Sequence, residues 1–134
     1  MLTSAVMCLA LNMFFEARNE PLSGQQMVAE VTINRVNSSD YPNTVCEVVW
    51  QNKQFSWTHD GKHDDPTRMG YLEREAWKTS LMAAEIILSD PETYLPNTGA
   101  THYHADYVQP YWTSNMTYLG KVGSHKFYKK NWEN

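Results

Sequence analysis

The chain has 134 residues, of which 42% are hydrophobic, 13% aromatic and 19% charged. This length predicts one domain that buries its core without needing a metal ion or a disulfide, and the composition excludes an intrinsically disordered protein. Eleven Lys and Arg against 15 Asp and Glu give a net charge of −4, which argues against a nucleic-acid-binding protein. No apolar run is long enough to span a bilayer.

The first helix is predicted to begin at Thr3 or Ser4, which can cap it. Apolar residues then recur at steps of three and four up to Ala17. The helix should end near Arg18, because Asn19 tolerates the left-handed conformation of a helix end. This apolar start lacks the basic region and cleavage site of a signal peptide, so we expect the protein to be cytoplasmic on synthesis.

A second helix is predicted from a capping box formed by Ser23 and Gln26. Apolar residues cover nearly every side of it, which is typical of a central, buried helix. Polar residues 37–40 end it, and Thr44 can cap a short helix that runs through Trp50.

Residues 51–70 are polar and predict a long loop, a feature that is often functional in compact domains. A third long helix is expected over residues 71–88, with Leu72 on its apolar face. Beyond it, residues 101–104 and 126–129 are β-prone. The predicted fold class is therefore α+β: a mainly helical single domain with a small antiparallel sheet formed by the C-terminal third.

Two carboxylates in the predicted helices are candidates for chemistry. Glu16 lies at the edge of the first apolar stripe, where desolvation raises a carboxyl pKa toward that of a useful general acid. Glu30 lies in the buried second helix and could be a second carboxylate. Position alone favours a plainer interpretation for both, an ion pair with Arg18 or Arg35.

Three histidines could hold a metal ion, and two cysteines could form a disulfide. His102 and His104 fall on one face of a strand, and His125 follows later. No motif of metal-ligand spacing accompanies them, so a metal is disfavoured. Cys8 and Cys46 both lie in apolar segments, and the sequence leaves their pairing open; we interpret them as buried, inert thiols.

Several segments together resemble the SleB/CwlJ-type cell wall hydrolases, whose founding members digest spore-cortex peptidoglycan. The central motif is E-A-R-N-E at residues 16–20, where Asn19 replaces the family's usual glycine. The other matching segments are residues 9–12, 24–25, 33–36, 41–45, 54–57, 100–104 and 123–128. They occur in family order and spacing over nearly the whole chain.

The resemblance implies that residues 1–134 form one catalytic domain that cleaves the MurNAc-GlcNAc glycan strand as a lytic transglycosylase. Glu16 would be its only catalytic acid, no cofactor or metal would be needed, and the enzyme would act as a monomer. A domain without a visible export signal resembles a phage endolysin that reaches the wall after release. Residues expected to bind substrate by stacking or hydrogen bonding are Asn34, Phe55, Ser56, Trp57, Tyr103, His104 and Trp112.

Three alternatives stay open at this point. A muramidase would hydrolyse the same bond with help from Glu30 or a loop aspartate. A zinc-dependent amidase would use His102, His104 and His125. A non-catalytic sugar-binding module would need only the aromatic residues.

Overall fold

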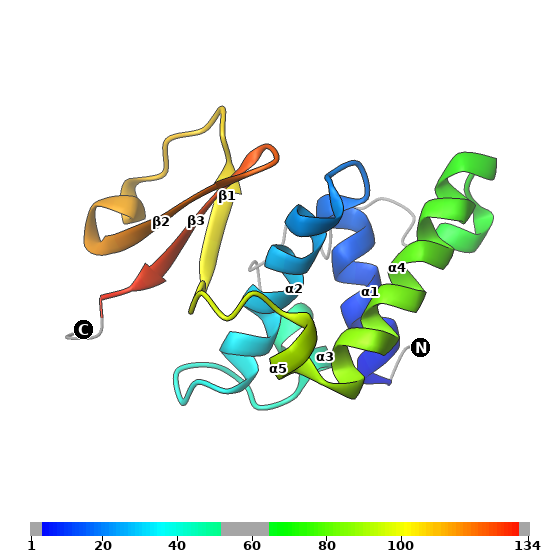
Figure 1. Cartoon of the computed structure of the whole chain (residues 1–134), viewed down its shortest axis with the longest axis horizontal. Helices are drawn as coiled ribbons and strands as arrows, with labels where there is room; N and C mark the ends of the chain where they lie inside the picture. Colours follow the sequence, from blue (N-terminus) through cyan, green and yellow to red (C-terminus); the bar gives the residue numbers. More distant parts are fainter. Residues whose placement is uncertain (1–3, 52–64, 132–134) are drawn as a thin grey trace.

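A computed structural model describes residues 4–51 and 65–131, and shows a helical body with a small sheet on one side (Figure 1). The elements in chain order are α1 (Ala5–Ala17), α2 (Leu22–Val36), α3 (Val45–Val49), η2 (Pro66–Arg68), α4 (Tyr71–Ser89), α5 (Pro91–Tyr94), β1 (His102–Ala105), η3 (Tyr111–Asn115), β2 (Met116–Val122) and β3 (His125–Lys130). The predicted α+β class is confirmed, because helices come first and a three-stranded antiparallel sheet follows.

The first helix, α1, begins and ends close to where the sequence predicts. Ser4 caps it by accepting a hydrogen bond from the Met7 amide at 3.1 Å. Arg18 ends it in a right-handed conformation, so the expected left-handed Asn19 is wrong. Among the described residues the non-glycine position with positive φ is Asn97. A left-handed residue is not needed, because the Glu20 amide closes the turn by donating to Ala17 O at 2.9 Å.

The second helix, α2, starts differently from the prediction. Its N-cap is Pro21, whose carbonyl accepts hydrogen bonds from the Gly24 and Gln25 amides, so the predicted capping box of Ser23 and Gln26 is wrong. Proline fixes φ and lacks an amide hydrogen, which suits it to the start of a helix. The central, buried character of α2 is confirmed, since most of its residues are buried.

The helices and the sheet share a core in two parts. The larger part lies among the helices around α1 and includes Leu9, Phe14 and Trp77. The smaller part joins α2 to the sheet through residues such as Val28 and Phe127. The predicted apolar face of α4 is confirmed at Trp77, Ala84 and Ile87, which are buried, but Leu72 is 75% exposed.

The sheet has the strand order β1-β3-β2, with both pairs antiparallel. The sequence did not predict strand β2, which lies outside the two β-prone segments. Its seven residues include exposed polar ones and a bulge follows Tyr118, so the strand lacks a regular alternation of apolar and polar residues. Tyr103 pairs with Phe127, so both face the helices, whereas His102 pairs with Tyr128 on the opposite face.

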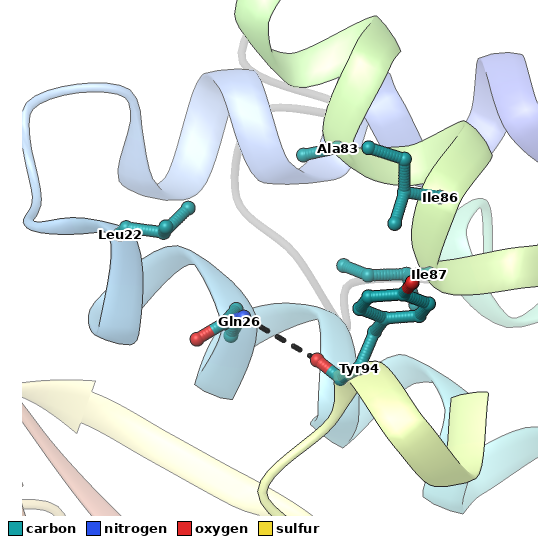
Figure 2. A pocket seen from close by; sticks show the side chains of 6 residues that line it. All are labelled: Leu22, Gln26, Ala83, Ile86, Ile87 and Tyr94. Atoms are coloured by element: carbon teal, nitrogen blue, oxygen red, sulfur yellow. Dashed lines mark hydrogen bonds between the residues drawn. The ribbon is translucent and has the colours of Figure 1, made fainter. Parts of the chain in front are cut away.

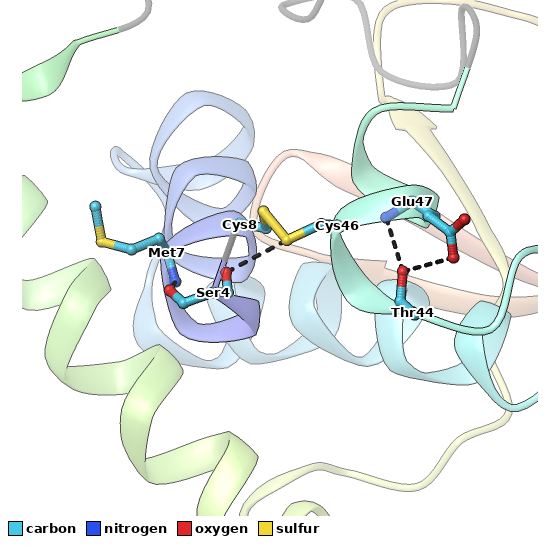
Figure 3. Close-up of a disulfide and its surroundings, with 6 residues drawn as sticks. All are labelled: Ser4, Met7, Cys8, Thr44, Cys46 and Glu47. Atoms are coloured by element: carbon cyan, nitrogen blue, oxygen red, sulfur yellow. Dashed lines mark hydrogen bonds between the residues drawn. A yellow bond between two sulfur atoms is a disulfide. The ribbon is translucent and has the colours of Figure 1, made fainter. Parts of the chain in front are cut away.

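A disulfide joins Cys8 in α1 to Cys46 in α3 (Figure 3). The interpretation of these residues as unpaired thiols is therefore wrong. Both helices begin beside the bond: the Thr44 hydroxyl caps α3 by accepting from the Glu47 amide, as Ser4 caps α1. The caps set where each helix begins, and packing of α3 against α1 then brings the two sulfur atoms together. Of the helices in the described ranges, none has the length and apolar character needed to cross a membrane.

Candidate active site

Glu16 and Tyr103 meet where the end of α1 comes against β1. The Tyr103 hydroxyl donates a hydrogen bond to Glu16 Oε1 at 2.6 Å. Tyr103 reaches this point because it lies on the face of β1 that is turned toward the helices and packs against both parts of the core. Glu16 as a residue keeps partial exposure, and the hydrogen bond from Tyr103 holds its carboxyl group in place.

Burial raises the pKa of Glu16 above its usual value. The hydrogen bond from Tyr103 and the positive charge of Arg35 act in the opposite direction without cancelling that rise. Burial also raises the pKa of Tyr103 well above its ordinary value, and the neighbouring Glu16 charge adds to the rise. Tyr103 therefore stays protonated at neutral pH and remains a donor to Glu16.

The two arginines considered as partners of Glu16 have different places. The Arg18 guanidinium lies over the Phe14 ring, 4.6 Å from its centroid. Arg35 is buried; its Nε donates to Thr101 O at 2.8 Å, directly before β1, and its charge favours ionised Glu16. The sequence named Arg35 only as a possible ion-pair partner of Glu16 or Glu30, and the structure shows that its charge acts on Glu16.

Glu30 holds the segment that leads into β1. Its Oε2 accepts hydrogen bonds from Thr98 N at 2.7 Å, Gly99 N at 2.9 Å, Thr98 Oγ1 at 3.0 Å and Asn34 Nδ2 at 3.0 Å. The predicted ion pair of Glu30 with an arginine is therefore wrong: backbone amides stabilise this buried carboxylate. With 1% exposure, Glu30 does not offer a second carboxylate to a substrate at Glu16.

Asn34 belongs to the same contact. Its side-chain amide donates both to Glu30 and to Ala100 O, the latter at 2.7 Å. The structure thus gives the Asn34 donors a role inside the fold, and its expected contact with substrate stays a prediction.

His104 and Trp112 lie on the face of the sheet that is turned away from Glu16. His104 Nδ1 lies 2.7 Å from Ala105 O, and because a carbonyl only accepts, Nδ1 carries the hydrogen. His104 Nε2 then accepts from the Tyr128 hydroxyl at 2.9 Å. Trp112 packs edge-on against both rings. These two residues follow Tyr103 closely along the chain, but in the structure they lie on the opposite face of the sheet from it.

The zinc alternative finds no support in the geometry. His102 and His104 share one face, as the alternation predicts, but His125 pairs with Ala105 and so lies on the other face. Within residues 4–51 and 65–131, no three His, Cys, Asp or Glu side chains come together as metal ligands.

The remaining predicted substrate-binding residues, Phe55, Ser56 and Trp57, lie outside the described residues. Of the site predicted from sequence, the structure brings together Glu16 and Tyr103. The sequence expected Tyr103 to stack on sugar and missed its bond to Glu16, because the two are 87 positions apart.

An apolar cavity of about 220 Å³ lies among α2, α4 and α5 (Figure 2). Its lining residues are Leu22, Gln26, Ala83, Ile86, Ile87 and Tyr94. The Gln26 side chain donates across it to Tyr94 O. None of the predicted site residues lines this cavity, and its lining offers no acid or base for catalysis near neutral pH.

A family model described as Cell Wall Hydrolase matches residues 19–128, which is well over half of the chain. The match begins just after Glu16. A spore cortex-lytic enzyme from Bacillus cereus is 29% identical over 125 residues, and one from Bacillus subtilis is 28% identical over 120 residues. These alignments cover 92% and 89% of this chain but 44% and 35% of the relatives, so the chain spans less than half of their length.

Two solved structures resemble the whole fold. The catalytic domain of the germination-specific lytic transglycosylase SleB from Bacillus anthracis has a TM-score of 0.68 at 28% identity, covering 96% of this chain and 97% of that domain. The catalytic domain of Bacillus cereus SleB has a TM-score of 0.63 at 25% identity, covering 96% of this chain and 93% of that domain. The helices and the sheet therefore have the arrangement of a known catalytic domain.

Proposed function

The chain belongs to the cell wall hydrolase family, and from this premise we propose that it cleaves the glycan strands of peptidoglycan as a lytic transglycosylase, with Glu16 as the catalytic acid. The observation that carries the proposal is the 2.6 Å hydrogen bond from Tyr103 to a partly exposed Glu16 whose pKa is raised by burial. The likeness to the SleB lytic transglycosylase domain supports the type of reaction.

The hydrogen bond decides which oxygen of Glu16 is the acid. Because the Tyr103 hydroxyl donates to Oε1, the proton of the neutral carboxyl group lies on Oε2. Oε2 then donates this proton to the glycosidic oxygen as the bond from muramyl C1 to that oxygen breaks. The negative charge that forms on Glu16 is stabilised by Tyr103 and by the charge of Arg35.

The ionised Glu16 next acts as the base. It accepts the proton of the muramyl C6 hydroxyl while O6 bonds to C1, which closes the 1,6-anhydro ring and returns Glu16 to its acidic form. Since the nucleophile belongs to the substrate, the attack is intramolecular and gains from proximity. A second carboxylate to activate water is then unnecessary, which agrees with the burial of Glu30.

The test is Glu16→Gln, which keeps the shape of the side chain and removes its acid. We expect the rate of release of soluble fragments from purified peptidoglycan to fall about 100-fold or more. Glu85→Gln, on the exposed side of α4, is the matched control and should keep full activity. Circular dichroism should show the same fold for all three proteins.

The products identify the reaction. Mass spectrometry should find 1,6-anhydromuramic ends on the fragments released by the parent protein. Reducing ends would instead indicate a muramidase, and binding to cell walls without soluble fragments would indicate a sugar-binding module. Full activity of the Glu16→Gln variant would reject Glu16 as the acid.

The proposed setting follows from the substrate. The protein would act as a monomer on the cell wall after release from the cytoplasm, as a phage endolysin does. The Cys8–Cys46 disulfide agrees with an enzyme that acts in an oxidising compartment, because such bonds are rare in the reducing cytoplasm. Residues 1–134 would suffice for cleavage as one catalytic domain.

A further inference from the structure

Glu20, four residues after Glu16, ties the corner between α1 and α2 to the turn between β2 and β3. Its two carboxylate oxygens accept hydrogen bonds from the Ser124 amide at 2.8 Å and from the Ser124 hydroxyl at 2.5 Å. These elements are distant in sequence, and the β2–β3 turn points toward the α1–α2 corner (Figure 1). Glu20 is thus a direct polar link between the helix that carries Glu16 and the sheet that carries Tyr103.

The turn at Ser124 is built for this close approach. Gly123 has a positive φ of 59°, and a Cβ on it would lie 2.1 Å from Glu20 Oε1 and 3.1 Å from Pro21 Cδ. Only glycine leaves room for the carboxylate here. On the other side, the Ser124 carbonyl accepts from the Asp106 amide at 2.8 Å, just after β1 ends. The turn is therefore held from both sides.

The residue after Ser124 faces Tyr103. The His125 ring meets the Tyr103 ring edge to face, with centroids 5.2 Å apart. His125 Nδ1 lies 3.9 Å from Glu20 Oε1, and only 12% of the His125 side chain is exposed. Within the described residues this buried nitrogen has no hydrogen-bond partner, so the ring is placed by packing and by the nearby carboxylate.

We propose that Glu20 is a positioning residue for the catalytic acid: by holding Ser124 it keeps His125 against Tyr103, whose hydroxyl orients Glu16. Two rings of β3 contact the Tyr103 ring, Phe127 at 5.5 Å and His125 at 5.2 Å between centroids. Without the hydrogen bonds from Ser124 to Glu20, the His125 ring can move away from Tyr103. The Tyr103 hydroxyl then no longer holds Glu16 Oε1 in one position. This inference rests on the proposed role of Glu16.

The chain offers a matched control. Asp40 accepts a hydrogen bond from Lys130 Nζ at 2.7 Å and so links a helix-side loop to the far end of the same strand, β3. Like Glu20, Asp40 is a carboxylate that joins the helical body to the sheet. Its partner Lys130 lies at the opposite end of β3 from His125. Asp40→Ala therefore reports the general cost of loosening the sheet, and Glu20→Ala reports the effect at Tyr103.

The experiment compares initial rates on purified peptidoglycan at saturating and at limiting substrate. Glu20→Ala should lower the saturating rate about 10-fold and change the half-saturating concentration less than about two-fold. Glu20→Gln should recover most of the rate, because its amide oxygen can still accept from the Ser124 amide. Asp40→Ala should stay within about two-fold of the parent rate. All rates are measured well below the melting temperature of each variant.

A double-mutant cycle with Tyr103→Phe tests the route of the effect. If Glu20 acts through the Tyr103 hydroxyl, Glu20→Ala costs less than about two-fold in the Tyr103→Phe background. A full 10-fold loss there, or an unchanged saturating rate in Glu20→Ala, overturns the inference. Should Glu20→Ala fail to fold, Ser124→Ala takes its place, with an expected loss of about three-fold and the same dependence on Tyr103. An active Glu16→Gln variant would instead reject the proposed function itself, so the two failures are distinguishable.

Discussion

Glu16 lies in the last turn of α1, where burial disfavours the ionised form of its carboxyl group. Burial raises its pKa, and the Tyr103 hydroxyl and Arg35 only partly compensate. The folded protein therefore holds a proton on Glu16 at pH values where the unfolded chain releases it. The contribution of Glu16 to stability is full below its unfolded pKa and is lost as the pH rises through the folded pKa. Removing the charge with Glu16→Gln should thus raise the melting temperature at neutral pH rather than lower it.

Replacing Tyr103 by Phe removes the hydroxyl but keeps the ring. The pKa of Glu16 should rise further, because the hydrogen bond that lowers it is lost. A general acid fails once it is ionised, so the activity of Tyr103→Phe should persist to a higher pH than that of the parent. Its maximal rate should nevertheless fall about 10-fold, since Glu16 loses its orientation. A pH–rate profile of both proteins measures the two effects.

A matched profile of Tyr118→Phe serves as the control, because Tyr118 lies 5.4 Å from Tyr128, ring to ring, on the opposite face of the sheet. A profile of Tyr103→Phe that descends at a lower pH than the parent's would contradict the assigned role of the Tyr103 hydroxyl.

Two links decide how the elements are held together. The Cys8–Cys46 disulfide closes a loop of 38 residues and joins the first turn of α1 to α3. Glu30, in the middle of α2, accepts hydrogen bonds from the backbone amides of residues 98 and 99. It thereby fixes the segment that leads into β1. Both links act on the elements that bring Glu16 and Tyr103 together, although neither touches the proposed catalytic carboxyl group of Glu16.

Replacing Cys8 and Cys46 by Ala should lower the free energy of unfolding by about 2 to 4 kcal/mol, because the unfolded chain is no longer constrained. The melting temperature should fall by roughly 5 to 15 °C. Calorimetry of the parent protein with and without reductant should give the same difference. Equal melting temperatures for reduced and oxidised protein would show that the disulfide does not form or does not stabilise the fold.

Glu30→Ala should lower the free energy of unfolding by about 2 kcal/mol, since it removes the acceptor of the partly buried hydrogen bonds from the Thr98 and Gly99 amides. Chemical denaturation measures this loss. Glu85→Ala, which removes an exposed carboxylate from α4, should change stability by less than about 1 kcal/mol. An equal, small effect of both substitutions would mean that water replaces Glu30 at these amides.

In residues 4–51 and 65–131 the molecule consists of a helical body and a sheet that packs one of its faces on that body. Glu16 and Tyr103 lie where these two layers meet, and the outer face of the sheet carries His102, His104 and Trp112. His125 lies on the other face, and among the described residues these three histidines do not come together as metal ligands. Cleavage of peptidoglycan should therefore be unchanged after treatment with EDTA, measured as release of soluble fragments. A loss of activity that zinc restores would contradict this prediction.

Local patterns in the sequence determined much of the helical layer. Ser4 and Thr44 cap their helices as predicted, and the buried character of α2 follows from its apolar residues. These features could be predicted because a cap or a helical period involves residues only a few positions apart. The likeness of several short segments to one family, in order along the chain, was also readable without a structure, as was the place of Glu16 at a helix end.

Only the tertiary structure decided what meets Glu16. The Tyr103 hydroxyl, the Thr98 and Gly99 donors to Glu30 and the sulfur partner of Cys8 come from distant parts of the chain. Tertiary packing likewise decides that Tyr103, and not His104, lies on the face of β1 that packs on the helices. A sequence period specifies that alternate residues of a strand face opposite sides, but which side meets the helices depends on how the layers pack. This packing places the Tyr103 hydroxyl, rather than the His104 ring, against the carboxyl group of Glu16.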